Sequence, residues 1–78
     1  MIKSQELTDP NSCMTRAKDD EMTFVLLARD ACAPDTIRYW VQHRIRLGKN
    51  QVDDPQIKEA LACAKTMENQ RLNLKQPT

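Results

Sequence analysis

The chain of 78 residues contains a single glycine, and aromatic residues make up only 4% of it. An all-β fold needs many turn residues and β-branched or aromatic strands, so this scarcity disfavours it. No apolar stretch approaches the roughly 18 residues of a membrane helix, and the first residues lack the apolar run of a signal peptide. The sequence therefore predicts a small, mainly helical domain without a membrane segment, and we expect it in the cytoplasm.

A charge excess of one sign is also missing, because 12 basic and 11 acidic residues leave a net charge of +1. This balance gives no general attraction to nucleic acid or to an anionic membrane, so any electrostatic site must be a local patch. The three cysteines are odd in number and irregularly spaced, which argues against a disulfide framework. Because no two of them form a C-x-x-C pair, we expect neither a metal nor another cofactor.

Two helices are marked by the residues at their ends. Pro34 suits the first turn of one helix and Gly48 suits its C-terminal end, which predicts a helix over 34–47. Asp54 followed by Pro55 marks the start of a second helix over 55–71. The short connection between them favours antiparallel packing. The expected seam joins the apolar residues of the two helices, Ile37, Trp40, Val41, Ile45, Ile57, Leu61, Ala64 and Met67.

The apolar run of residues 22–28 cannot be assigned by periodicity alone. The acidic residues 19–21 favour a helix start, whereas Thr23, Phe24 and Val25 favour a strand. Because no second strand is evident, the sequence predicts a short helix over 21–29, with a short strand as the alternative. The expected fold is a small all-α domain of three helices over 19–72. An extended or partly disordered arm (1–18) would precede it, and a flexible tail (73–78) would follow it.

The helix expected over 34–47 carries most of the candidate binding residues. Arginine, lysine and histidine side chains can contact an anion or nucleic acid, and the outer face of this helix and the loop beyond it present Arg38, His43, Arg46 and Lys49. The simpler interpretation is a solvated face.

Arg44 falls inside the apolar stripe of the same helix. There it either snorkels to solvent, pairs with a carboxylate such as Asp30, or binds an anion. Arg29 is a second candidate for an anion contact. Neither a glycine-rich loop nor a recognised catalytic pattern is present, so we expect no enzymatic activity.

Phe24, Val25, Leu26 and Leu27 form a continuous apolar run that cannot all face inward from one short helix. Exposed apolar patches usually mark an interface, and a symmetric homodimer is the commonest way to cover one. If the run were a strand, its open edge would seek the same strand of a second chain. Both interpretations predict a homodimer built around residues 22–28.

Residues 16–68 also resemble a family of small uncharacterised proteins that are common in bacteriophages, prophages and bacterial genomes. The resemblance is carried by an acidic pair, an FVLL run, an Arg-Asp, an Ala-Pro, a tryptophan and a helix containing Cys-Ala and Met-Glu: Asp19, Asp20, residues 24–27, Arg29, Asp30, Ala33, Pro34, Trp40, Cys63, Ala64, Met67 and Glu68. It implies an accessory role in a phage or mobile element and no particular chemistry.

Together these features predict a non-enzymatic accessory protein that binds a host or phage macromolecule, with a protein as the expected partner. One alternative is a nucleic-acid-binding module that uses the face carrying Arg38 and Arg46. The other is an oligomer that binds a small anionic ligand, such as a nucleotide, through Arg29 or Arg44.

Overall fold

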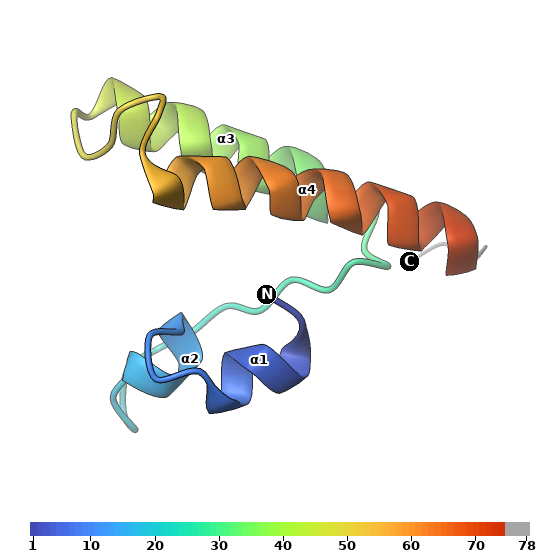
Figure 1. Ribbon diagram of the computed structural model, residues 1–78, viewed down its shortest axis with the longest axis horizontal. Helices are drawn as coiled ribbons and strands as arrows, with labels where there is room; N and C mark the ends of the chain where they lie inside the picture. The colour runs from blue at the N-terminus through green and yellow to red at the C-terminus, as the bar shows by residue number, and fades with distance from the viewer. Residues whose placement is uncertain (75–78) are drawn as a thin grey trace.

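The computed structural model describes residues 1–74, and it describes the side chains of residues 1–72. Over this range the chain forms four helices and no strand: α1 (Lys3–Thr8), α2 (Cys13–Arg16), α3 (Ala33–Arg46) and α4 (Pro55–Leu74). Figure 1 shows α3 and α4 lying side by side, with α1 and α2 apart from them and an extended stretch of chain between. The predicted all-α class is confirmed. No helix within residues 1–74 is long and apolar enough to cross a membrane.

The end of α3 explains the position of the only glycine. The backbone N–H of Gly48 donates to the carbonyl of Ile45, and the N–H of Lys49 donates to the carbonyl of Arg44, both over 3.0 Å. These two bonds satisfy carbonyls that the last turn of a helix otherwise leaves free. Gly48 has a φ of +73°, a conformation that costs glycine little and other residues more. The helix therefore ends one residue from its predicted limit.

α4 begins directly after Asp54, as predicted, but the Asp54 carboxylate is held by the loop before the helix and, among the described residues, accepts no N–H group of α4. The Asp54 carboxylate accepts the backbone N–H of Gln51 over 2.9 Å and the side-chain amide of Asn50 over 3.0 Å. These hydrogen bonds hold the pKa of the Asp54 carboxyl below its ordinary value. α4 continues to Leu74, three residues beyond the predicted end, so part of the expected tail is helical. Residues 75–78 lie outside the described part.

The seam between α3 and α4 is made largely of small side chains. Val41 of α3 and Ile57 and Ala64 of α4 are buried, and so is Ala33 at the start of α3. The antiparallel arrangement is as predicted, but the placement of Trp40 in the seam is wrong, because its side chain is 39% exposed. The buried positions are taken by smaller side chains, and the Trp40 ring instead lies against the Arg44 guanidinium, 5.4 Å from the ring centre.

The helix predicted over 21–29 is absent, and the strand alternative is not observed in the described residues. Residues 22–27 have no regular secondary structure and run as an extended chain between the two parts of the molecule (Figure 1). The Glu21 carboxylate accepts the backbone N–H of Lys18 over 3.0 Å and does not cap a helix. A short helix containing Thr23 and Val25 is marginal without tertiary packing, and Phe24 finds none.

The segment 1–18, predicted to be an extended arm, contains α1 and α2. Ser12 is buried, its hydroxyl donates to the carbonyl of Glu6, and it accepts the backbone N–H of Thr15 over 3.1 Å. The Glu6 carboxylate accepts the backbone N–H of Met14 over 2.9 Å. These polar contacts hold the two short helices together, and we call residues 1–17 the N-terminal unit. In the described part, no Cα atom of α1 or α2 lies within 8 Å of one in α3 or α4.

Candidate functional site

An open groove of about 940 Å³ lies between the N-terminal unit and α4. One wall comes from α1 and the start of α2, the other comes from α4 between Glu59 and Gln70, and residues 23–28 line it between them. Large apolar side chains dominate the lining: Met1, Ile2, Leu7, Met14, Phe24, Val25, Leu26, Leu27 and Met67. Concave, mainly apolar surfaces of this size are the usual form of binding sites in proteins.

Residues 22–28, here called the apolar segment, are the most exposed apolar stretch of the chain. Met22 is 95% exposed and Phe24 is 86% exposed, while Val25 and Leu27 are each more than half exposed. Leu26 is partly covered. The residues predicted as an interface therefore all lie on the groove, and the structure leaves most of their surface uncovered.

The backbone of the apolar segment is as uncovered as its side chains. Among the described residues, its N–H groups donate to no protein acceptor. Within residues 1–74, one of its carbonyls is used, that of Leu27, which accepts the N–H of Asp30 over 3.0 Å. An extended chain with free N–H and C=O groups is a template for pairing with another strand.

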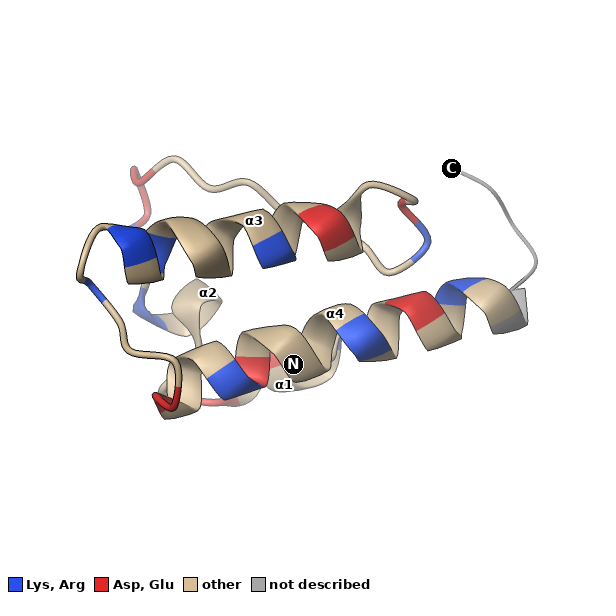
Figure 2. Ribbon diagram, turned by 90° about the horizontal axis from the view of Figure 1, so that it is seen from above, with Lys and Arg blue, Asp and Glu red and all other residues tan. Residues whose placement is uncertain are grey.

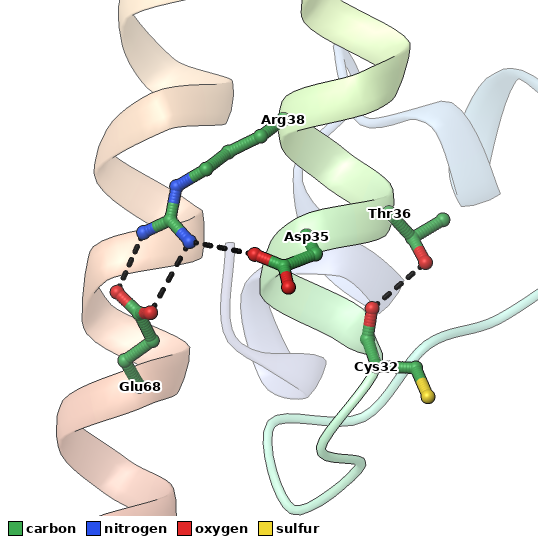
Figure 3. A network of polar contacts seen from close by, with 5 residues as sticks. All are labelled: Cys32, Asp35, Thr36, Arg38 and Glu68. Atoms are coloured by element: carbon green, nitrogen blue, oxygen red, sulfur yellow. Dashed lines mark hydrogen bonds and ion pairs between the residues drawn. The ribbon is translucent and has the colours of Figure 1, made fainter.

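Arg38, predicted on the outer basic face, instead joins α3 to α4. Its guanidinium donates to both carboxylate oxygens of Glu68 over 2.6 and 3.1 Å, and to Asp35 over 3.2 Å (Figure 3). The hydrogen bond raises the pKa of Arg38 and lowers the pKa of the Glu68 carboxyl. The Arg38 guanidinium is thus bound by two carboxylates. Arg38 therefore holds the two helices together, and its charge is already neutralised.

The Arg44 side chain is held by the Trp40 ring and by the side-chain amide of Asn50. Its guanidinium carbon lies 5.4 Å from the centre of the Trp40 ring, and its Nε donates to Asn50 Oδ1 over 2.7 Å. The carboxylate partner that the sequence suggested, Asp30, instead accepts the backbone N–H of Cys32 over 2.8 Å. The contacts of Arg44 are those of a structural residue that ties the end of α3 to the loop after it.

The remaining cations of the predicted patch gather at the C-terminal end of α3. Figure 2 shows this end of the helix in blue, and Lys49 follows in the exposed loop. The His43 ring stacks on Tyr39 with centroids 5.9 Å apart, and its Nδ1 lies 3.2 Å from Nη2 of Arg46. Arg29 is exposed and precedes α3, so it does not belong to this patch. Without Arg38, the patch is small.

The three cysteines are free thiols. Cys13 and Cys32 are exposed and Cys63 is half-buried. Figure 3 shows Cys32 at the start of α3, where its carbonyl accepts the Thr36 hydroxyl over 2.7 Å. No group of three or more His, Cys, Asp or Glu side chains within the described residues is arranged to hold a metal ion.

Sequence reasoning missed two features of the site. The wall formed by α4, which includes Cys63 and Met67, could not be foreseen because the N-terminal unit opposite it was not predicted. The contact between Arg38 and Glu68 could have been found, since antiparallel helices joined by the loop 47–54 bring these positions to the same level.

No protein-family model, curated protein or solved structure matches this chain. The resemblance to small phage and prophage proteins gains no support from these comparisons and stays a prediction.

Proposed function

We propose that this protein is a non-enzymatic accessory protein that works by binding another protein chain along the groove and the apolar segment. The observation that carries the proposal is the exposure of the apolar segment, above all of Phe24 at 86%. A phenyl ring left in water forgoes about 1.5–3 kcal/mol of burial free energy. Several such side chains in one patch mark an interface.

The total surface of the chain supports the same proposal. Its solvent-accessible surface is 6462 Å², whereas a folded monomer of 9.0 kDa exposes about 4,900 Å². If the undescribed residues 75–78 are counted at full unfolded exposure, about 650 Å², an excess of about 900 Å² remains. A stable protein–protein interface buries about 800 Å² of each partner. The excess is therefore large enough for one interface.

We propose that the first chain to cover this surface is a second copy, which makes the protein a homodimer. A patch that covers itself across a two-fold axis is the commonest solution among soluble oligomers. The patch is uncharged from residue 22 to residue 28, so two copies can meet there without like-charge repulsion. A cytoplasmic location and a phage or mobile-element setting belong to the same proposal and rest on the sequence alone.

Nucleic acid is the rival partner, and the structure weakens its case. The predicted basic face has lost Arg38 to Glu68 and Asp35, and the net charge of the chain is +1. Nucleic-acid binding through the few remaining cations would fall steeply as salt rises. Association through apolar surface would survive moderate salt, so the two partners are separated by a salt titration.

The test is the mass of the purified protein in solution, measured by sedimentation or light scattering from micromolar to millimolar concentration. We expect twice the chain mass of 9.0 kDa for the wild type and the single-chain mass for Phe24→Asp. Val52→Asp is the matched control, because Val52 is 71% exposed but lies in the loop before α4, away from the groove. A wild type that stays monomeric, with the helicity of the structure, would defeat the dimer.

A further inference from the structure

We propose that the second copy binds along the main chain of the apolar segment, so that two copies form an antiparallel two-stranded ribbon with its two-fold axis at Val25. This inference rests on the proposed dimer and adds the way in which the two chains pair. It assigns to residues 22–28 the strand conformation that a lone chain cannot complete, since a strand needs a neighbour.

The first argument is the state of the backbone. Residues 22–27 are already extended, and their N–H groups have no protein acceptor among the described residues. The stretch combines β-branched, aromatic and aliphatic residues, and it holds no charge, no proline and no glycine. This composition is that of segments that pair readily as strands. Pairing with a second copy would give these free groups partners, and it requires residues 28 and 29 to leave the turn that the Leu27 carbonyl and the Asp30 N–H close in the single chain.

The second argument is the order of side chains. With the axis at Val25, the midpoint of the segment, Phe24 of each copy lies opposite Leu26 of the other. Directly opposed residues of an antiparallel pair have Cβ atoms about 4.5–5.5 Å apart, close enough for two large apolar side chains to contact one another. Phe24 is the bulkiest exposed side chain of the segment and Leu26 is partly covered. The ribbon thus places the exposed Phe24 ring of each copy against an apolar side chain of the other copy.

The third argument is the charge at the two ends of the segment. Glu21 precedes it and Arg29 follows it, and both residues are exposed. In the antiparallel ribbon, Glu21 of one copy is level with Arg29 of the other, and the symmetry axis makes this pair twice. A parallel ribbon would place Glu21 beside Glu21 and Arg29 beside Arg29. The flanking charges therefore select the antiparallel form, since like charges directly opposed are destabilising.

The decisive experiment is residue-resolved amide hydrogen exchange of the wild-type dimer. In an antiparallel pair, every second N–H along the strand donates to the partner. We expect every second amide of residues 22–28 to exchange at least about tenfold more slowly than its neighbours. If the protein has the mass of a dimer and all these amides exchange fast, the strand pairing is wrong and the proposed function stands. If the protein is a monomer, both fail.

Cysteine cross-linking tests the position of the axis. In a variant with Cys13, Cys32 and Cys63 replaced by serine, we expect Val25→Cys to form a covalent dimer under mild oxidation. Residues facing themselves across the axis have Cα atoms about 4.5–5.5 Å apart, inside the range that a disulfide spans. Val52→Cys in the same background is the control and should stay monomeric on denaturing gels. Equal cross-linking of the two variants would overturn the assigned axis.

A charge exchange tests the direction of the ribbon. Glu21→Arg alone and Arg29→Glu alone each put like charges together at both ends, so each should weaken dimerisation by about two- to thirtyfold. The double variant restores opposite charges and should recover most of the loss. If the double variant instead loses as much dimerisation free energy as the two single variants lose together, the antiparallel pairing is wrong.

Discussion

The two halves of this molecule hold themselves together in different ways. The hairpin of α3 and α4 closes on an apolar seam of Val41, Ile57 and Ala64 and is fastened across its surface by Arg38 and Glu68. The N-terminal unit closes on a buried hydroxyl, that of Ser12, and on hydrogen bonds to the backbone of Glu6 and Thr15. Among the described residues, every fully buried apolar side chain belongs to the hairpin, and the N-terminal half buries none.

This difference indicates where the fold is complete and where it is not. Because folding replaces hydrogen bonds to water with hydrogen bonds inside the protein, each contributes only about 0.5–1.5 kcal/mol. The N-terminal unit depends on such bonds and therefore gains little stability. Apolar burial contributes more to stability, and in the first half of the chain the described apolar side chains are not yet buried. The proposed binding surface belongs to the less complete half.

The largest expected effect on stability comes from a substitution in the buried seam of the hairpin, which tests whether apolar burial holds this half together. Ile57 is fully buried, so Ile57→Ala should lower the free energy of unfolding by about 2–5 kcal/mol, through lost burial and the cavity left behind. Chemical denaturation followed by circular dichroism measures the change. Val52→Ala, in the exposed loop, should alter stability by less than about 0.5 kcal/mol. Comparable losses in both variants would mean that Ile57 is not in the core.

The next test concerns the turn that closes the hairpin. Gly48→Ala should destabilise the protein by about 1–2 kcal/mol, because a Cβ strains the backbone at positive φ. Nothing lies within 4 Å of the Cβ position, so the cost is conformational and not a clash. Gly48→Asn should cost less, since asparagine tolerates this conformation. A thermal melt in which the two variants lose the same stability would contradict this account.

A smaller and more local effect is expected in the N-terminal unit. Ser12→Ala leaves the Thr15 N–H without its partner and leaves the Glu6 carbonyl with only the Thr15 hydroxyl as a side-chain donor, and it should loosen α1 and α2 by about 0.5–2 kcal/mol. Amide exchange should quicken in residues 13–17 and stay unchanged in α3 and α4. Ser4→Ala, at an exposed serine of α1, is the control. Loosening of the hairpin by Ser12→Ala would show that the two halves are coupled.

The smallest expected effect is on the pH dependence of the hairpin. The pKa of the Glu68 carboxyl is lowered from 4.5 by Arg38, so the unfolded chain binds its proton at higher pH than the folded one. The stabilisation is therefore present above that ordinary value and is lost as pH falls through the lower folded pKa. The melting temperature of Glu68→Gln should fall less than that of the wild type as the solution is acidified. Parallel losses in both proteins would rule out a role for this carboxylate.

The sequence predicted the hairpin well because its signals are local. Pro34, Gly48 and Pro55 set backbone conformations by their own chemistry, and the observed limits agree with the predicted ones within three residues. Its antiparallel arrangement followed from the short loop. Trp40 was misplaced because helical periodicity assigns a residue to a face but does not say how closely the neighbouring helix will approach.

The first half could not be predicted because its contacts join residues that no pattern links. Ser12 reaches Glu6 across a turn, and neither α1 nor α2 is long enough to carry a periodic signal. The helix predicted over 21–29 was wrong because the acidic residues before it were taken as a cap. The interface predicted at residues 24–27 rests on a reason that does not depend on conformation, namely an uncharged apolar run too long for one small core, and it stays a prediction.

The local pairing of α3 with α4 also has a consequence for the order of events in time. A helical hairpin closed by a loop of a few residues has low contact order, and such structures fold within microseconds to milliseconds. During synthesis the apolar segment leaves the ribosome before α3 and α4 exist, and no later part of the described chain covers it. The hairpin therefore completes itself on one chain at any concentration. If the segment pairs with a second copy as proposed, that step needs an encounter between molecules, and its rate depends on the concentration of the protein.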